Sequence, residues 1–250
     1  DDVAVVDGAI VTDLPAWGDD LAVKFVGSVA VGGATPAAGN VFGSVRGDGS
    51  LLVTTSEGER DVLFVRTEDG NWVRKDAASG LEQGSVGGHI VSFTDPKDGG
   101  VYSAGSGDGG LMLLRDAGDG SWEGRNLTAE GSGREAIARS LTFYETPDDR
   151  FGIAGLSESG DLLLYYQTFG KDAATGERVW GFANLSESHF RARGVAPPEF
   201  VGELSAYTTA WDARHIAGLT ADGDIRQVGW APTANFGKWW KTSNLTEISG

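Results

Sequence analysis

One order of short apolar runs and turns recurs along most of the chain. The run at residues 153–156 (IAGL) recurs as the identical run at residues 216–219. The turn at residues 157–161 recurs at the same offset, at residues 220–224. Four tryptophans open the last run of successive copies: Trp72, Trp122, Trp180 and Trp240. A repeat of this kind predicts equivalent structural units that stack on one another.

Each copy contains four short apolar runs, separated by Gly, Asp and Ser. Runs of about four to eight residues with such boundaries predict β-strands. Helices are disfavoured, because Gly interrupts most runs and none extends over about ten residues with helical periodicity. Four strands in a repeat of about 50 to 63 residues are typical of one blade of a β-propeller. One blade cannot bury both faces of its sheet alone, so blades stack around an axis.

The sequence therefore predicts an all-β fold, a single β-propeller domain over residues 1–250 with about five four-stranded blades. The blades are expected at about residues 1–40, 41–77, 89–128, 140–186 and 201–246. In the alternative, the first of these segments forms an incomplete N-terminal blade beside four complete ones. We expect the N-terminal strands to close the ring beside the last blade, since an open ring leaves unpaired edges and exposed sheet faces.

The composition narrows the classes of partner. The net charge of −16 disfavours nucleic acids and anionic membrane surfaces as partners. A protein that binds either of them needs clustered Lys and Arg. No stretch is long and apolar enough to span a bilayer, so no membrane insertion is expected. Cysteine is absent, which excludes disulfides and thiolate metal sites. Because the chain begins at Asp1 without a Met or a signal peptide, we expect an excised domain or the mature form of an exported protein, extracellular or periplasmic.

The loops indicate where a ligand would bind. We name the strands of a blade A to D, outward from the axis. The A–B loops and the C–D loops then lie on the same face of the propeller. Two C–D loops are long, at residues 168–179 and 231–238, and long loops often carry function. Aromatic side chains stack on sugar rings, and Asp accepts hydrogen bonds from sugar hydroxyls. In the alternative interpretation, the aromatic residues pack beneath the loops. The candidate ligand-binding residues, between the last two blades, are Asp148, Asp149, Trp211, Asp212, Phe236 and Trp239.

A cation site is expected at the acidic A–B loop of the preceding blade. Asp95 and Asp98 supply carboxylate oxygens on one loop, and such ligands suit Ca²⁺. In the alternative, both residues only form the turn, which Asp favours. Their spacing does not match a known calcium-binding loop. His89, His189 and His215 lie in different blades and share no metal-ligand spacing.

Asn-Leu-Ser/Thr follows the fourth run of three copies, at residues 126–128, 184–186 and 244–246. These tripeptides are formal N-glycosylation sequons. Because they recur at equivalent positions, we interpret the Asn side chain as a structural group that hydrogen-bonds the backbone where the D strand ends. Of the repeated tryptophans, Trp72, Trp122 and Trp180 are predicted to be mostly buried and to pack between neighbouring blades.

Residues 67–72 and 116–122 form predicted hairpins that look like the Asp-box of sialidases, Ser-x-Asp-x-Gly-x-Thr-Trp. The spacing between Asp, Gly and Trp is shorter here, the last two blades lack the motif, and no sialidase-type arginine triad can be assigned. Residues 41–250 resemble β-propellers in general, without WD-repeat or kelch signatures. The resemblance implies the architecture and leaves the activity open.

We therefore expect a non-enzymatic binding domain of an exported protein, which recognises a carbohydrate or a protein through one loop face. A polysaccharide-acting glycoside hydrolase or lyase is the first alternative, because carboxylates about 5–10 Å apart can serve as acid and base. A structural or oligomerisation propeller is the second alternative. The sequence has no phosphate-binding Gly-rich loop and no nucleophile elbow. No catalytic residue is predicted, and Ca²⁺ is the one cofactor considered.

Overall fold

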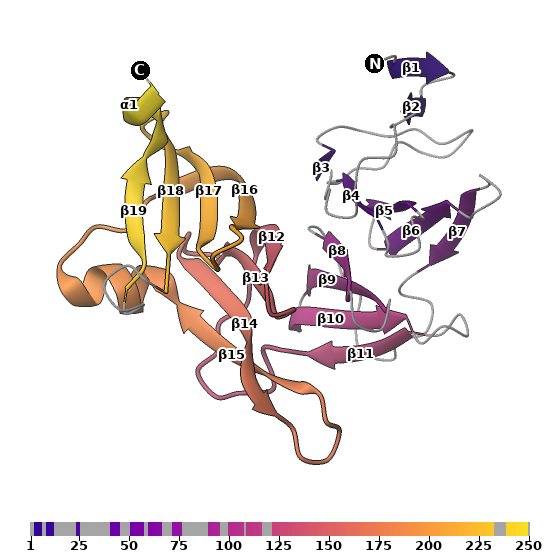
Figure 1. Cartoon of the computed structure of the whole chain (residues 1–250), viewed down its shortest axis with the longest axis horizontal. Helices are drawn as coiled ribbons and strands as arrows, with labels where there is room; N and C mark the ends of the chain where they lie inside the picture. The colour runs from indigo at the N-terminus through magenta and orange to yellow at the C-terminus, as the bar shows by residue number, and fades with distance from the viewer. Residues whose placement is uncertain are drawn as a thin grey trace. The chain divides into compact units, whose positions relative to one another are not determined.

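The computed structural model describes the backbone of every strand named below. The residues described with their side chains are 90–93, 95, 100–106, 109–115, 123–232 and 239–248. The chain divides into two compact units, residues 1–126 and 127–250 (Figure 1). No helix among the described residues combines the length and the hydrophobicity of a transmembrane span.

The first unit contains antiparallel sheets of two, five and four strands. Its strands are β1 (Val3–Val6), β2 (Ala9–Thr12), β3 (Lys24–Phe25), β4 (Val41–Val45), β5 (Leu51–Glu57), β6 (Arg60–Arg66), β7 (Trp72–Asp76), β8 (Ile90–Thr94), β9 (Val101–Gly107), β10 (Gly110–Asp116) and β11 (Trp122–Asn126). The strands expected in two predicted blades are confirmed as β4 to β7 and β8 to β11. Nearer the N-terminus, β1 pairs with β2, whereas β3 pairs with β4.

The second unit contains two four-stranded antiparallel sheets, in which the strands follow chain order. One sheet consists of β12 (Arg139–Glu145), β13 (Phe151–Leu156), β14 (Leu162–Lys171) and β15 (Arg178–Asn184). The other consists of β16 (Phe200–Thr208), β17 (Arg214–Thr220), β18 (Ile225–Trp230) and β19 (Lys241–Asn244). Three short helical segments follow the last strands: η1 (Ser186–Phe190), η2 (Arg191–Arg193) and α1 (Leu245–Ser249). The all-β prediction is confirmed.

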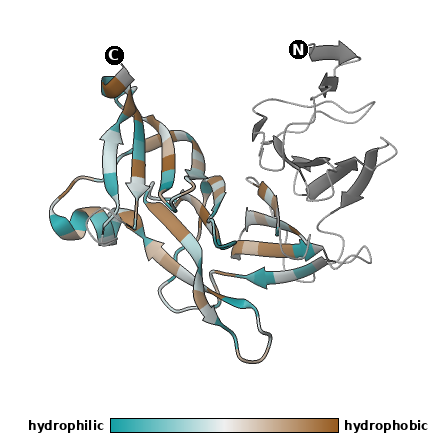
Figure 2. Ribbon diagram, in the orientation of Figure 1, coloured by the Kyte–Doolittle hydropathy of each residue, from teal (hydrophilic) through white to brown (hydrophobic). Residues whose placement is uncertain are grey.

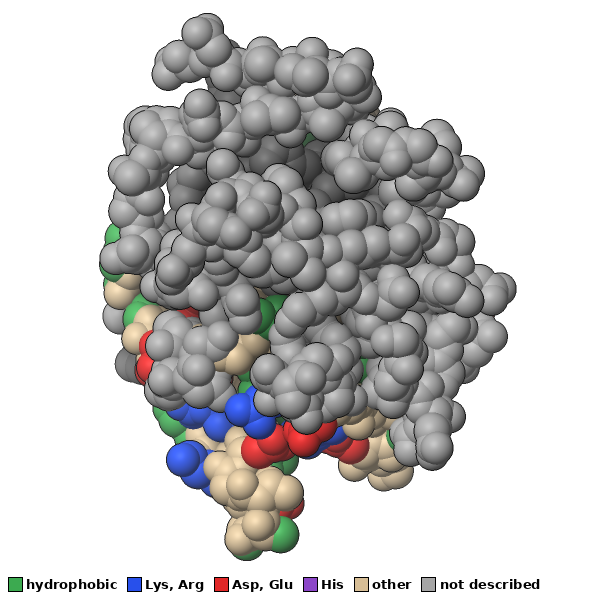
Figure 3. All heavy atoms as spheres, turned by 90° about the vertical axis from the view of Figure 1, so that its right-hand side faces the viewer, with side chains coloured by type: hydrophobic (Ala, Val, Ile, Leu, Met, Phe, Trp, Pro, Cys, Tyr) green, Lys and Arg blue, Asp and Glu red, His purple; other side chains and the backbone are tan. Residues whose placement is uncertain are grey.

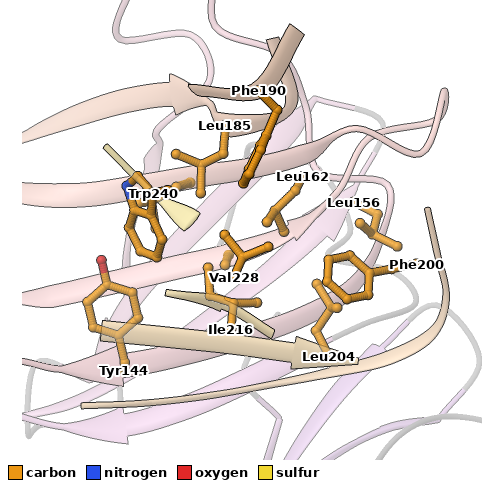
Figure 4. Close-up of a cluster of buried hydrophobic side chains, with 12 residues drawn as sticks. Tyr144, Leu156, Leu162, Leu185, Phe190, Phe200, Leu204, Ile216, Val228 and Trp240 are labelled. Carbon is orange, nitrogen blue, oxygen red and sulfur yellow. The ribbon is translucent and has the colours of Figure 1, made fainter. Parts of the chain in front are cut away.

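The core of the second unit lies between these two sheets (Figure 4). The β12–β15 sheet contributes Leu156 and Leu162, and the β16–β19 sheet contributes Phe200 and Leu204, all of them buried. β13 is buried at every residue, because both of its faces are covered. Figure 2 shows the same pattern in hydropathy, because the first half of β14 is hydrophobic.

The Asn-Leu-Ser motif after β15 has the structural role that its recurrence predicts. The Asn184 Nδ2 donates to Asp161 Oδ2 (3.1 Å), and the Asn184 Oδ1 accepts a bond from the backbone N–H of Glu187 (2.9 Å). The Ser186 hydroxyl accepts a bond from the backbone N–H of Leu162 (2.9 Å). The motif therefore joins the end of the D strand to the turn that precedes the C strand.

The second copy of the motif makes equivalent bonds after β19. Asn244 Nδ2 donates to Asp224 Oδ2 (2.6 Å), and the hydroxyl of Thr246 accepts from the backbone N–H of Ile225 (2.8 Å). Asp224 and Ile225 are the repeat equivalents of Asp161 and Leu162, the partners in the first copy. The interpretation of these Asn side chains as structural groups is therefore confirmed.

The repeated tryptophans are buried wherever their side chains are described. Trp180 is 3% exposed and Trp240 is 5% exposed. The side chains of Trp72 and Trp122 lie outside the described residues. The predicted burial is therefore confirmed for Trp180. Trp240, at the equivalent position of the next copy, packs in the core of the second unit.

The prediction of a long loop at residues 168–179 is wrong in the extent of the loop. β14 continues to Lys171 and β15 begins at Arg178, and these two residues pair across the hairpin. The turn between them is closed by Asp172, whose N–H donates to the carbonyl of Glu177 (2.8 Å) and whose Oδ1 accepts from the N–H of Ala174 (2.8 Å). Backbone pairing therefore continues into the loop, and a projecting β-ribbon results (Figure 1).

Candidate functional site

The turn between β12 and β13 is built on a threonine and two aspartates. The Thr146 hydroxyl donates to Asp148 Oδ1 (2.5 Å) and accepts from the backbone N–H of Arg150 (3.0 Å). The N–H of Asp149 donates to the carbonyl of Thr146 (2.9 Å). Asp149 has a φ of 55°. Asp tolerates this left-handed conformation better than most residues, because its short side chain can bond locally. Asp149 therefore shapes the turn.

The turn between β16 and β17 repeats this geometry. The Thr209 hydroxyl accepts a bond from the N–H of Ala213 (3.1 Å), and the N–H of Asp212 donates to the Thr209 carbonyl (2.9 Å). Asp212 has a φ of 61°. Trp211, which precedes it at the tip of the turn, is 67% exposed. This turn therefore presents a large aromatic surface to the solvent.

Each turn also orients an arginine through an aspartate. Asp212 holds Arg214 with two bonds, from Nε to Oδ1 (3.1 Å) and from Nη2 to Oδ2 (3.0 Å). Asp148 Oδ2 accepts from Arg150 Nε (2.7 Å). Both arginine side chains are largely buried, at 12% and 8% exposed. A charged group held in this way loses little conformational entropy when it binds a further partner.

Aromatic rings cover both guanidinium groups. The Arg214 Cζ lies 4.5 Å from the centre of the Trp230 ring and 6.0 Å from that of Tyr144. The Arg150 Cζ lies 4.0 Å from the ring centre of Phe169, which is 76% exposed. Cation–π contacts of this length are attractive, and they fix the plane of each guanidinium.

Tyr144 connects the two turns. Burial is the main reason why the pKa of Tyr144 is raised to about 12. The positive charges of Arg214 and Arg150 lower this pKa, and the negative charge of Asp212 raises it. Groups from both turns therefore lie close enough to the phenol to influence it. The hydroxyl therefore stays protonated at neutral pH.

Asp148 stays ionised under ordinary conditions. Burial tends to raise its pKa, but the hydrogen bonds from Arg150 and Thr146 outweigh that effect and lower the pKa to about 2.

Two aspartates in other turns also have lowered pKa values. The hydrogen bond from Arg191 is the main cause for Asp161, and the hydrogen bond from Thr220 is the main cause for Asp222. On the face turned toward the viewer in Figure 3, acidic and basic side chains likewise lie next to one another.

We name the group Tyr144, Arg150, Phe169, Trp211, Arg214 and Trp230, with the paired aspartates Asp148 and Asp212, the arginine edge. It includes three of the predicted site residues, and Asp149 belongs to the same turn as Asp148. Trp239 lies instead against the helical connector, with its ring centre 6.0 Å from that of His189 and 4.9 Å from the Arg193 Cζ. Phe236 lies outside the described residues.

The two arginines, Tyr144, Trp230 and Phe169 were absent from the candidates chosen from sequence. One signal points to the arginines: Asp-x-Arg occurs at the entry to both B strands, as Asp148-Asp149-Arg150 and Asp212-Ala213-Arg214. The pair of Arg214 and Trp230 is not repeated in the preceding sheet. The repeat-equivalent positions there hold Phe151 and Gln167.

The expected calcium site stays a prediction. Asp95 donates its backbone N–H to the carbonyl of Gly100 (2.9 Å), which closes the hairpin between β8 and β9. Asp98 lies outside the described residues. Among the described residues, no group of three or more His, Cys, Asp or Glu side chains is arranged to hold a metal ion.

Comparison with known proteins bears on the fold. No protein-family model matches the chain, and neither does any curated protein. AofleA from Arthrobotrys oligospora is similar in structure over 82% of this chain, with a TM-score of 0.54 and 13% sequence identity. This chain spans 56% of the length of AofleA. At this identity the likeness concerns the fold alone.

Two further solved structures are similar at lower scores. The Aleuria aurantia lectin, solved in complex with α-methyl-L-fucoside, has a TM-score of 0.36 and 10% identity, over 81% of this chain and 77% of the lectin. A protein of unknown function from Dyadobacter fermentans has a TM-score of 0.45 and 14% identity, over 80% of this chain and 67% of that protein.

Proposed function

We propose that this chain is a carbohydrate-binding domain and that a neutral sugar binds at the arginine edge. The observation that carries the proposal is Arg214, which is fixed by two bonds to Asp212 and stacked 4.5 Å from the Trp230 ring. Rigid polar groups beside aromatic surface are what a sugar-binding site requires, because a sugar has hydroxyls around its rim and apolar C–H faces.

Exposed aromatic rings supply the apolar part of such a site. Trp211 is 67% exposed and Phe169 is 76% exposed. Exposure of so much aromatic surface is costly in water, and a sugar ring that stacks on it removes that surface from solvent. Phe169 already covers the guanidinium of Arg150, so its ring has one defined position.

The charge balance favours a neutral ligand over an acidic one. Arg150 is paired with Asp148 and Arg214 with Asp212, so the two arginines carry no unbalanced positive charge. A carboxylate or sulfate ligand would have to approach two aspartates as well as two arginines. A guanidinium has five N–H donors, and the carboxylate pairing uses at most two of them. The remaining donors suit hydroxyl oxygens.

A glycoside hydrolase is less well supported. A general acid at neutral pH needs a carboxyl group whose pKa is raised. Asp148, Asp161 and Asp222 instead have lowered pKa values, so each stays ionised. These three carboxylates are suited to hold arginines or hydroxyls, and binding without catalysis accounts for them.

We also propose that the four-stranded sheets are blades of one propeller of about five blades. In the second unit, the first strands of successive sheets, β12 and β16, lie against each other, and in the first unit β4 and β8 do the same. Contact through the first strands is the arrangement that stacking around an axis requires. An exported location, extracellular or periplasmic, belongs to this proposal, because a glycan-binding domain of this kind would meet its ligands there.

Calorimetric titration with a panel of neutral and acidic sugars tests the function. The panel includes α-methyl-L-fucoside, other neutral monosaccharides, and glucuronic acid. We expect the parent to bind a neutral member, and Trp211→Ala and Phe169→Ala to weaken that binding roughly tenfold or more. Val201→Ala is the matched control, because Val201 is also exposed, at 50%, and lies near the start of β16, at the other end of this strand from the Trp211 turn.

Three results would contradict the proposal. In the first, the parent binds no sugar of the panel, and in the second it binds only the acidic member. In the third, both aromatic variants bind as the parent does. Because both aromatic side chains are exposed, the variants are expected to keep the parent melting temperature, so a loss of binding would not reflect unfolding.

A further inference from the structure

The helical connector between β15 and β16 is fixed to the second unit at two neighbouring residues. It consists of the short helical segments η1 and η2. Phe190 is buried in the core between the two sheets. Arg191 donates to both carboxylate oxygens of Asp161, from Nη1 (3.0 Å) and from Nη2 (2.6 Å). The connector therefore holds the side chains that it presents to solvent in defined positions.

Two of these side chains meet a tryptophan that lies just before β19. The Arg193 Cζ lies 4.9 Å from the ring centre of Trp239, and the His189 ring meets the same indole edge-on, with 6.0 Å between the ring centres. Arg193 Nη1 also donates to the carbonyl of His189 (3.2 Å). The stacking and this bond together fix the guanidinium. We name Arg193, His189 and Trp239 the connector cluster.

The connector cluster carries one positive charge, on Arg193. The Arg193 side chain is exposed, and no carboxylate of the described residues forms an ion pair with it. Burial, and then the charge of Arg193, lower the pKa of His189, so the imidazole is neutral at pH 7. Arg191, two residues away, is balanced by Asp161 and Glu187.

The cluster is similar to the pair of Arg214 and Trp230, but it lacks the carboxylate. At the arginine edge, Asp212 accepts two bonds from Arg214. A guanidinium has five N–H donors, and the described residues accept one bond from Arg193, at the His189 carbonyl. A planar carboxylate is the group that matches a guanidinium with two parallel bonds. A ligand with a carboxylate would therefore complete the arrangement.

We propose that the connector cluster is a second binding site, for a sugar that carries a carboxylate, such as glucuronic acid. The carboxylate pairs with Arg193, and the apolar C–H face of the sugar ring lies on Trp239, which is 39% exposed. The net charge of −16 opposes the approach of an anion. At physiological ionic strength, however, exposed charges more than about 8 Å away are largely screened. Arg193 is therefore the charge that acts most strongly on a bound carboxylate.

The cluster is open to a ligand in the propeller proposed above. The connector begins at the end of β15 and Trp239 lies just before β19, so the cluster lies beside two D strands. D strands form the outer rim of a propeller, whereas blades stack through the faces of their sheets. All three residues of the cluster belong to the second unit. The stacking of blades therefore leaves this position uncovered.

Calorimetric titration with glucuronic acid, acetate and glucose tests the site. We expect glucuronic acid to bind the parent with a Kd of about 1 mM, and Arg193→Gln to weaken this binding roughly tenfold. Lys171→Gln is the matched control, because it removes the same charge from another exposed side chain, at the end of β14, and should bind as the parent does. Trp239→Ala should reduce the affinity for glucuronic acid to that for acetate, which has the carboxylate without the ring. Glucose has the ring without the carboxylate, so the parent and Arg193→Gln should bind it alike.

Any of four results would overturn the proposal. The parent binds no glucuronic acid, Arg193→Gln binds it no more weakly than Lys171→Gln does, acetate binds as tightly as glucuronic acid, or Arg193→Gln weakens the binding of glucose. Because Arg193 is exposed, Arg193→Gln should keep the parent melting temperature, so weaker binding would not reflect unfolding. The neutral-sugar titrations of the arginine edge concern other residues. Either proposal can therefore fail while the other stands.

Discussion

Arg214 and Trp230 lie face to face at the ends of two adjacent strands, with the guanidinium carbon 4.5 Å from the indole ring centre. The two residues are directly paired in the β17–β18 register. Asp212 holds the other side of the guanidinium with two bonds. A single arginine therefore joins a turn, a sheet edge and an aromatic surface, so changes to it affect both stability and the proposed binding.

Replacing Arg214 by Lys separates charge from geometry. Lysine keeps the positive charge, but it cannot make the two-bond pairing with Asp212 or stack a planar group on Trp230. We expect a loss of about 1 kcal/mol in the free energy of unfolding and roughly tenfold weaker binding of the neutral sugar. Urea denaturation and calorimetric titration measure the two effects. Binding equal to that of the parent would show that only the charge matters.

Truncating the buried tryptophan at the start of β15 should be much more damaging than truncating an exposed one. Trp180 is 3% exposed and Trp211 is 67% exposed. Trp180→Ala should cost about 3–5 kcal/mol, because it leaves a large cavity. Trp211→Ala should change the free energy of unfolding by less than about 0.5 kcal/mol. Similar melting temperatures for the two variants would contradict the assignment of Trp180 to the core.

The Asn184 side chain should contribute to stability through its cap on the helical turn. Asn184→Ala removes the acceptor for the N–H of Glu187 and the donor to Asp161. We expect a loss of about 1–2 kcal/mol. Asn184→Asp is the informative partner variant, because it keeps the acceptor and places a second carboxylate beside Asp161. If thermal unfolding of the Asp variant matches the parent, the donor contributes nothing.

Acid should weaken the fold through Asp148. Its pKa is lowered in the folded state from 3.8 to about 2. The folded state therefore favours the ionised form, so this stabilisation is present above about pH 4 and is lost as the pH falls toward 2. Asp148→Asn should flatten the fall of the melting temperature in that interval, as measured by circular dichroism from pH 5 to 2. Parallel curves for the parent and the variant would show that Asp148 contributes little.

The strands could be predicted from sequence because local signals agree with the repeat. Each run is bounded by turn residues, and the same turn recurs at a fixed offset, as in residues 157–161 and 220–224. The cap made by Asn184 was predictable for the same reason. Such features depend on neighbours that are close in the chain, and one sequence contains them.

The candidate site was less predictable, because its contacts depend on packing between strands and sheets. Arg214 is defined by Trp230, which belongs to another strand and is adjacent only through strand pairing. The run IAGL occurs twice, yet Leu156 is buried and Leu219 is half exposed. Identical local sequence cannot distinguish these two states, since the difference lies in whether another sheet covers the face.

The bonds of Asn184 have a consequence for producing this protein. Its side-chain nitrogen donates to Glu135 Oε2 (3.2 Å) as well as to Asp161 Oδ2, so both amide hydrogens are used. An oligosaccharide on this nitrogen would remove one of these bonds and separate the strand end from its turn. A eukaryotic secretory host would have to modify the sequon before folding completes, and the glycosylated chain would then fold poorly. A bacterial host without this modification avoids the competition.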